Sequence, residues 1–399
     1  MDGVRLQPRG SSQGGLRQYN ERVVLQAIRL HGALPAAELA RLTHLTAQTI
    51  SLITKRLLDD GLLLKGEPVR GKVGQPSVPL SLNPDGAYAI GIKLGRRSLD
   101  VLLVDFVGAV RERWSMDYAF PEPGAVLAEI GRRLIDIDKM LGPKRRQCLQ
   151  GVGIAAPLSM GGWQELLGVD PTQAARWNAV DLRDEVARLT PLPVELLKDT
   201  AAACVAELVA GRGRSVHSFL YVFVDTFIGG CLVIDSHLRA GLHGNAGAIG
   251  SMPLGLAAET APPQLLSRAS LLNLERLFTA AGLDPSAAGD ARALQAPWAP
   301  VTQGWLAESA SAIALAINSA ACLLDLDGVI VDGSFSRELL AALIAALDEA
   351  AGRYSWEGVV KPRALPGTIG SDARAIGGAL LPLYANFAPD RELFLKVVA

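Results

Sequence analysis

The chain has 399 residues, of which 49% are hydrophobic and 20% charged, a composition that excludes a disordered protein and allows two or three domains. The net charge of −1 is unevenly placed, because residues 1–82 carry 11 Lys and Arg against 6 Asp and Glu while the remainder is acidic. A basic N-terminal module on an acidic body favours a nucleic-acid-binding head. The pattern shows no signal peptide, bilayer-spanning run or zinc spacing among Cys148, Cys204, Cys231 and Cys322, so we expect a reduced, cytoplasmic protein without a metal or membrane contact.

Residues 1–19 lack hydrophobic periodicity and predict a mobile arm, followed by a first helix over residues 21–30. Residues 34–64 then divide into two short helices around a turn at Thr43 and His44. Such turns often need a positive φ, which histidine adopts more readily than a β-branched residue. The second helix begins after Thr46, a good N-cap residue, and ends at Asp60. A plain helical hairpin would have the same spacing.

The second helix of this pair carries short polar side chains opposite its apolar stripe. Near a helix N-terminus, such side chains can contact base edges in a DNA major groove. The DNA-contacting residues predicted here are Thr46, Gln48, Thr49, Ser51 and Lys55, and Thr54 is expected on the same exposed face. A strand over 62–65, a loop over 66–77 and a returning strand over 78–82 complete a winged helix-turn-helix.

The loop of this wing contains two cations, Arg70 and Lys72, among glycines. Cations on a flexible backbone can contact phosphates or enter a minor groove, so both are predicted to bind DNA. An ordinary solvated loop is the alternative. Pro79, in the returning strand, is expected to be tolerated because a hairpin this small has only edges.

Beyond a turn at residues 83–86 the pattern changes to alternating strands and helices, which indicates a domain boundary. Strands are predicted over 88–94, 99–105, 109–116, 150–155 and 194–197, and helices over 126–141, 181–189 and 200–210. The strand–turn–strand opening recurs over 219–224 and 229–234, with helices over 271–281, 308–324 and 337–350 and a strand over 328–331. Two such units predict a two-lobed α/β body with a ligand site in the cleft between the lobes.

The sequence contains no convincing dinucleotide-binding or metal-binding motif. The run Gly151-Val152-Gly153 imitates a dinucleotide-binding loop, but its glycines lie within a predicted strand instead of in a turn before a helix. His217, His237 and His243 have no metal-ligand spacing. We therefore predict no cofactor and no metal.

Several short motifs, from about residue 15 onward, make the chain resemble the ROK family of repressors and sugar kinases. In the head, the resemblance lies in residues 20–21, 38–40 and 45–46 and in Gly74-Gln75-Pro76 of the wing. In the body, the segment from Lys198-Asp199 to residue 207 is similar to the family's Asn-Asp-Ala-Asn-x-Ala-x-x-Ala-Glu. Residues 244–251 are similar to its Gly-x-Ala-Gly-Glu-x-Gly-His, and Trp177-Asn178 falls where the family has a sugar-side loop.

This resemblance implies a winged helix-turn-helix followed by a two-lobed, actin-like (ribonuclease H-like) sugar-kinase fold. The implied division is an arm over 1–19, a DNA-binding domain over 20–83, a first lobe over 84–210 with a C-terminal return over 371–399, and a second lobe over 211–370. It also implies a small-molecule effector between the lobes, a sugar or sugar phosphate. The residues predicted to bind it are Trp177, Asn178, Lys198, Asp199, Asn245 and Gly247.

The phosphate loops depart from those of the family's kinases. Where a kinase has Asp-x-Gly-Gly-Thr, this chain has Lys93-Leu94-Gly95-Arg96-Arg97, and Asp225 and Asp332 stand where later loops have Gly. A carboxylate at these positions should repel a triphosphate. Of the groups that phosphoryl transfer needs, only the base candidate Asp199 remains, so we expect a vestigial site and no enzyme activity.

The sugar side has changed as well. Lys198, Ala248 and Ser251 stand where the family has Asn, Glu and His, so hydroxyl-binding groups are lost and a cation is gained. An acidic sugar or sugar phosphate is therefore favoured over a neutral sugar, and a cleft that binds nothing is the alternative. The family's zinc cluster has no counterpart, because residues 255–270 contain no cysteine.

The sequence thus predicts a homodimeric transcriptional regulator, a repressor of carbohydrate metabolism genes. Its predicted partners are a double-stranded DNA operator and a small-molecule effector. An active sugar kinase with an accessory DNA-binding head is the alternative that the phosphate-loop substitutions disfavour. A further alternative is an interaction protein whose lobes dock another polypeptide, and the sequence does not separate that role from ligand sensing.

Overall fold

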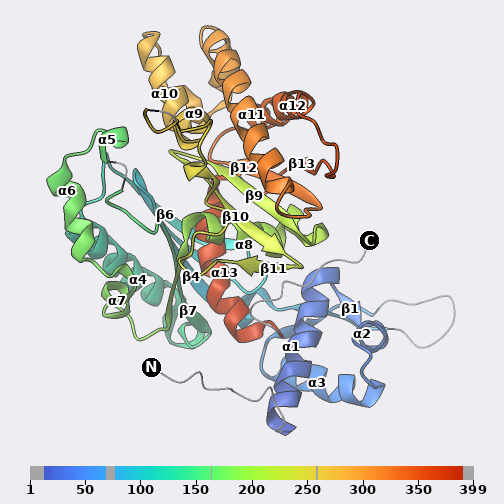
Figure 1. The fold of residues 1–399 in the computed structure, drawn as a ribbon. Coiled ribbons are helices and arrows are strands. Elements are labelled where there is room, and N and C mark those ends of the chain that lie inside the picture. The colour runs from blue at the N-terminus through green and yellow to red at the C-terminus, as the bar shows by residue number, and fades with distance from the viewer. Residues whose placement is uncertain (1–12, 69–76, 163, 258, 390–399) are drawn as a thin grey trace, which may run out of the picture.

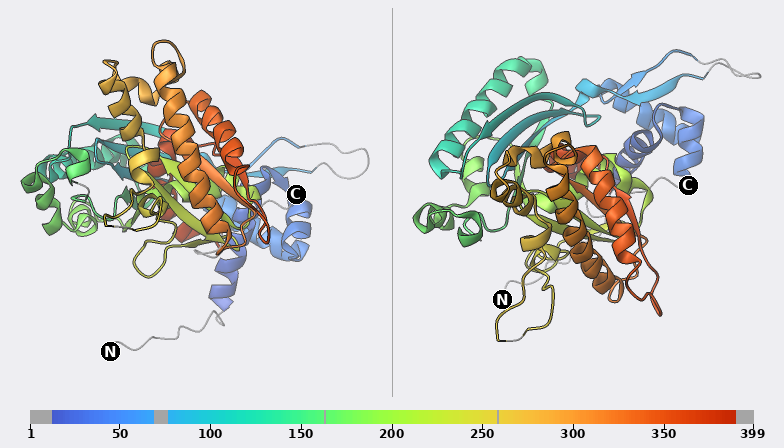
Figure 2. Two further views of the ribbon diagram at one scale, coloured as in Figure 1. Left: turned by 45° about the horizontal axis from the view of Figure 1, so that its top comes forward. Right: turned by 90° about the horizontal axis from the view of Figure 1, so that it is seen from above.

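The computed structural model describes residues 13–68, 77–162, 164–257 and 259–389. They form a small N-terminal head beside a body of two α/β lobes (Figures 1 and 2). The wing residues Arg70 and Lys72, and most of the predicted arm, lie outside the described residues.

The head consists of three helices and a small sheet. The helices are α1 (Gln13–His31), α2 (Ala36–Thr43) and α3 (Ala47–Asp59), and the sheet has the order β1 (Leu34–Pro35), β3 (Pro79–Leu82), β2 (Leu63–Lys65). The turn between α2 and α3 has the predicted geometry. His44 has a φ of 56°, and the side-chain oxygen of Thr46 accepts the backbone N–H of Thr49 at 3.2 Å.

Two predictions for the head are wrong, and the tolerance of Pro79 has a different reason from the predicted one. The first helix begins at Gln13 instead of residue 21. Pro79 lies in the central strand, where it is tolerated as the first residue, because its partner in β1 is Pro35 and its carbonyl accepts the N–H of Gly66. Thr54 is buried, since its hydroxyl donates to the carbonyl of Ile50 at 2.8 Å and so needs no solvent.

The two lobes of the body share one sheet topology. The first sheet has the order β6 (Val110–Asp117), β5 (Ser98–Asp105), β4 (Tyr88–Leu94), β7 (Leu149–Ala156), β8 (Val194–Lys198). The second has the order β11 (His237–Arg239), β10 (Ile228–Ile234), β9 (Phe219–Val224), β12 (Gly328–Gly333), β13 (Arg363–Pro366). In each sheet the first three strands along the chain are antiparallel, and the last two run parallel to the middle strand. The repeated unit predicted from the two strand–turn–strand openings is therefore present.

Helices cover these sheets. The first lobe has α4 (Pro123–Arg146), α5 (Gln164–Leu167), α6 (Pro171–Ala175) and α7 (Leu182–Ala187); the second has α9 (Leu266–Ala269), α10 (Leu271–Ala280), α11 (Ala299–Ala321) and α12 (Arg337–Ala351). Helix α11 begins well before the predicted residue 308. Its first turns contain Pro300 and Gly304, which weaken the local signal, but Thr302 and Trp305 are buried there and packing overrides propensity.

Two helices of small residues, α8 (Asp199–Ala210) and α13 (Ala373–Phe387), lie side by side at the centre of the body (Figure 1). A Cβ added at Gly377 would lie 1.7 Å from the carbonyl oxygen of Ala202, so only glycine permits this approach. Gly153 of β7 has the same role, because its added Cβ would lie 1.9 Å from the carbonyl oxygen of Gly378. The glycines that imitate a dinucleotide loop therefore accommodate the C-terminal helix.

Candidate functional site

Helix α3 presents most of its predicted DNA-contacting side chains on one open surface. Gln48, Ser51 and Lys55 are exposed and follow one another at helical spacing, while Thr49 is half-buried beside its cap Thr46. The helix N-terminus adds a partial positive charge that suits a phosphate. This surface has the hydrogen-bonding groups and the shape required for contact with a major groove.

Helix α1 connects the head to several parts of the body. Arg214, in the turn after α8, donates to the carbonyl of Leu30 at 2.6 Å. Gln26 donates to the hydroxyl of Tyr384 in α13 at 3.4 Å, and the Arg29 guanidinium lies 5.1 Å from the ring centroid of Phe106, after β5. Helix α1 therefore contacts the first lobe, the central helix α13 and the segment leading to the second lobe.

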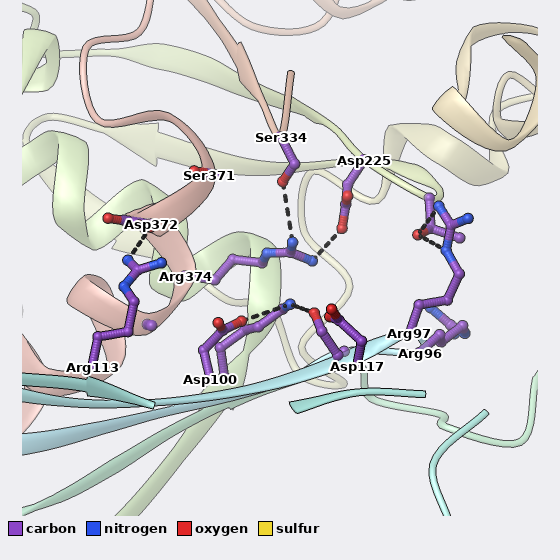
Figure 3. A pocket seen from close by; sticks show the side chains of 15 residues that line it. Arg96, Arg97, Asp100, Arg113, Asp117, Asp225, Ser334, Ser371, Asp372 and Arg374 are labelled. Atoms are coloured by element: carbon purple, nitrogen blue, oxygen red, sulfur yellow. Dashed lines mark hydrogen bonds and ion pairs between the residues drawn. The ribbon is translucent and has the colours of Figure 1, made fainter. Parts of the chain in front are cut away.

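Between the lobes, one cavity of about 270 Å³ lies at the turns where the resemblance implies a phosphate site. Side chains of both charges line it (Figure 3): Lys93, Arg96, Arg97, Asp100, Arg113, Asp117, Asp225, Asp372 and Arg374. We call this cavity the phosphate-side cavity.

Ion pairs between distant segments line the phosphate-side cavity. Arg97, after β4, donates to both carboxylate oxygens of Glu275 in α10, at 2.7 and 2.8 Å, and to the hydroxyl oxygen of Thr226 at 3.0 Å. Arg374 of α13 pairs with Asp225 at 2.5 Å and donates to Ser334 at 3.2 Å (Figure 3). These arginines therefore tie the lobes together in the place where the resemblance implies nucleotide phosphates.

The charges in this network stabilise one another. Burial acts to raise the pKa of Asp225, but Arg374 and Lys93 outweigh it and hold the pKa below its ordinary value. Burial acts to lower the pKa of Arg374, but Asp225 and Asp199 raise it above its ordinary value. Burial and the nearby Arg374 lower the pKa of Lys93, which also pairs with Asp100 at 3.0 Å. Carboxylates therefore offset most of the positive field that a triphosphate would need in this cavity.

Asp332, the other carboxylate predicted to repel phosphate, has a structural role. It is fully buried at the end of β12 and accepts the N–H of Gly370 at 2.8 Å and a guanidinium N–H of Arg337 at 3.0 Å. A Cβ added at Gly367 would lie 2.5 Å from the Cβ of Asp332. The Asp332 side chain therefore fills the loop in which the family's kinases have glycine.

A second cavity, of about 370 Å³, adjoins the first, and Arg96 lines both. We call it the sugar-side cavity. The Arg96 guanidinium donates to the carbonyl of Ser159 at 3.0 Å and lies 4.9 Å from the ring centroid of Phe227. Burial lowers the pKa of Arg96, but an arginine remains charged at neutral pH. Lys198, which donates weakly to the carbonyl of Gly230 at 3.4 Å, is a second cation in this lining, which also contains the carboxylate of Asp199.

The structure separates the predicted effector residues. Lys198, Asp199 and Asn245 line the sugar-side cavity. Trp177 is buried and its indole N–H donates to the carbonyl of Pro121 at 2.8 Å, so it supports the first lobe and is not part of the cavity lining. Gly247, with a φ of 75°, packs against the backbone of Cys231, and the exposed Asn178 also lies away from this lining.

Residues that the site prediction omitted complete the lining. They include the apolar side chains of Leu158, Phe227 and Leu266 and the imidazole of His243. Apolar residues in turns and short helices carry no distinctive pattern, so no local signal identified them. Within the described segments, no cluster of three His, Cys, Asp or Glu side chains could hold a metal ion, and no helix is long and apolar enough to cross a membrane.

Fold and site together define a winged-helix head on a two-lobed body, with one cavity lined by interlobe ion pairs and an adjoining cavity with apolar walls. Residues 89–264 match the model of the ROK family, so this segment of the chain is similar to that family. A xylose repressor from Caldicellulosiruptor bescii is 28% identical over 238 residues, which cover 59% of this chain and 58% of the repressor. Three further relatives are described as xylose repressors, and the chain spans 59 to 62% of their length.

Solved structures have the same fold. A ROK family transcriptional regulator, described as a homologue of the E. coli MLC protein, matches 94% of this chain and 97% of its own length, with a TM-score of 0.66 at 21% identity. A ROK family glucokinase from Streptomyces griseus, in complex with glucose and AMPPNP, matches 73% of this chain and 98% of its own length, with a TM-score of 0.58 at 19% identity. The predicted fold class is confirmed.

Proposed function

We propose that this protein is a homodimeric transcriptional repressor of carbohydrate metabolism genes that responds to a small molecule bound in the sugar-side cavity. The observation that carries the proposal is the cleft itself. On its phosphate side, Arg97 and Arg374 are paired with Glu275 and Asp225 across the lobes. On its sugar side, Lys198 and Arg96 line a cavity that has one carboxylate and apolar walls. The likeness to xylose repressors supports a sugar-related effector.

The DNA-binding surface in this proposal is the exposed face of α3 with the wing. Thr46, Gln48, Thr49, Ser51 and Lys55 would contact the major groove, and Arg70 and Lys72 would contact phosphates or a minor groove. The proposed domain division is residues 20–83 for the head, 84–210 with 371–399 for the first lobe, and 211–370 for the second.

The proposed effector is anionic, an acidic sugar or a sugar phosphate. Lys198 and Arg96 place two cations beside the single carboxylate of Asp199 in the sugar-side cavity. Charge-assisted hydrogen bonds to such a ligand are stronger than those between neutral groups. The Asp199 carboxylate would accept hydrogen bonds from hydroxyl groups of the effector, and the Asn245 amide would accept or donate them. Trp177, Asn178 and Gly247 would hold the surrounding loops in place.

The route from effector to DNA would pass through α1. A ligand that changes the spacing of the lobes shifts the contacts of Arg214, Gln26 and Arg29, which all meet at this helix. A ligand changes an equilibrium only if it binds one state better than the other. The effector would therefore bind more tightly to the lobe arrangement with the lower DNA affinity.

DNA selection tests the proposal most directly. The purified full chain is mixed with fragmented genomic DNA, and the retained fragments are sequenced with and without a panel of neutral and acidic sugars. We expect pseudo-palindromic sites with half-sites about 10 bp or a multiple apart. Retention of no preferred sequence, or retention unaffected by every sugar while a sugar is phosphorylated, would favour an active kinase with an accessory head.

Two substitutions separate base contacts from phosphate contacts. Gln48→Ala should relax the sequence preference with little change in salt dependence, because a Gln–adenine pair carries about 1–3 kcal/mol of discrimination. Lys55→Ala should weaken binding to all sequences and make the slope of log K against log salt shallower by about 0.9 if it neutralises one phosphate. Gel shifts over a salt series measure both.

A further inference from the structure

Leu52 lies in the middle of the exposed face of α3 and is 67% exposed. It follows Gln48 by four positions and precedes Lys55 by three, so the three side chains form one row on the helix surface. Gln48 and Lys55 are exposed as well. A large apolar side chain therefore interrupts a row of polar ones, on the surface that the proposed function places against DNA.

The fold of the head does not need an apolar residue at this position. The buried face of α3 is formed by Ile50, Ile53, Thr54 and Leu57, which point to the opposite side of the helix. Toward α1, the space beside Leu52 is bordered by the ion pair between Arg56 and Glu21, at 2.9 Å. Leu16 and Ile53 line the same groove, yet Leu52 remains 67% exposed, so packing within the head covers only a minor part of its side chain.

The charges along α3 indicate which end would approach DNA. Asp59 and Asp60 are exposed at the C-terminal end and would be repelled by phosphates, whereas the N-terminal end carries Thr46, Gln48 and the positive end of the helix dipole. Leu52 lies in the second turn, close to the end that would enter the groove. Four residues of helix rise about 6 Å, which corresponds to one or two base-pair steps of about 3.4 Å.

We propose that Leu52 contacts the C5-methyl group of a thymine in the major groove, one or two base pairs from the pair contacted by Gln48. This inference rests on the proposed function as a DNA-binding regulator. Thymine is the DNA base that presents a methyl group in the major groove, and apolar side chains recognise it by contact. Leu52 therefore selects a T·A pair at one position of each half-site and excludes water there.

Replacing thymine by deoxyuridine tests this contact, because the substitution removes only the methyl group. The full wild-type chain first selects duplexes from a random pool, and each thymine of the selected site is then replaced singly by deoxyuridine. Loss of one buried methyl should weaken wild-type binding about fourfold at one position per half-site. Leu52→Ala should bind the thymine duplex more weakly and lose this sensitivity at that position.

Leu16→Ala is the matched control, because Leu16 is an exposed leucine of α1, 60% exposed, on the other side of the groove that Leu52 borders. This variant should keep the wild-type deoxyuridine profile. If Leu52→Ala keeps it too, or if no thymine is sensitive, the inference is overturned while DNA binding stands. Dissociation of a dimer by Leu52→Ala with an unchanged profile would assign Leu52 to a second copy and also overturn it. Selection of no sequence would overturn the proposed function and this inference together.

Discussion

The two cavities of the interlobe cleft are neighbours that share Arg96, yet their chemistry differs. In the phosphate-side cavity, arginines from one segment pair with carboxylates from another, as Arg97 does with Glu275 and Arg374 with Asp225. The sugar-side cavity is lined by Lys198 and Arg96, by the single carboxylate of Asp199 and by apolar side chains. The phosphate-side cavity is thus crossed by ion pairs that join the lobes, whereas the sugar-side cavity has apolar walls and more cations than carboxylates.

The largest expected effect that would contradict this difference between the cavities is phosphoryl transfer from ATP. Because the phosphate-side cavity holds paired charges, we expect no ATP-dependent phosphorylation of hexoses or amino sugars, against the roughly 1–10³ s⁻¹ usual for enzymes. A coupled ADP-release assay with a sugar panel measures it, with Asp199→Ala as the control. Turnover in that range that disappears in Asp199→Ala would show a working kinase.

Next in size is the cost of removing one partner of the central ion pair. Arg374→Ala removes the ion-pair partner of the largely buried Asp225, so we expect a loss of about 3–5 kcal/mol in the free energy of unfolding. Arg353→Ala is the matched control, because the pair of Arg353 with Glu349 is exposed and should contribute at most about 1 kcal/mol. Urea unfolding compares the two, and equal losses would mean that the network does not stabilise the lobes.

The sugar-side cavity is probed by changing its added cation. Lys198→Asn should weaken the binding of an acidic sugar or sugar phosphate about tenfold, which is roughly 1.4 kcal/mol, because one charge-assisted hydrogen bond is lost. Neutral sugars should bind the two proteins alike. Isothermal titration with paired neutral and anionic sugars makes the measurement. Tight binding of a neutral hexose that is unaffected by Lys198→Ala and Asp199→Ala would move the effector out of this cavity.

The smallest expected effect is a change in acid stability. The folded-state pKa of Asp225 lies below its ordinary value, because Arg374 and Lys93 outweigh the effect of burial. Its stabilising contribution is therefore present above the unfolded-state pKa of about 3.9 and is lost as the pH falls through the lower folded-state pKa. Asp225→Asn should thus make the free energy of unfolding less dependent on pH below about 4. An unchanged slope would mean that other carboxylates govern acid unfolding.

Local patterns in the sequence determined the main elements and the character of the head. The strands β4 and β9 have the predicted bounds, and the turn before α3 has the predicted N-cap and positive φ. These features depend on neighbouring residues, through hydrophobic periodicity, capping hydrogen bonds and backbone sterics. The substitutions in the phosphate loops were also visible in the sequence, as a loss of small and acidic residues around Arg96.

Only the tertiary structure decided which contacts the substituted residues of the phosphate loops make. Arg97 meets Glu275 and Arg374 meets Asp225, although each pair is separated by well over a hundred residues, so no local pattern relates them. Trp177 and Lys198 both match sugar-side segments, yet Trp177 donates to Pro121 inside the first lobe while Lys198 reaches the cavity. Long-range packing places such side chains, because their partners come from elements that the fold brings together and the linear order does not.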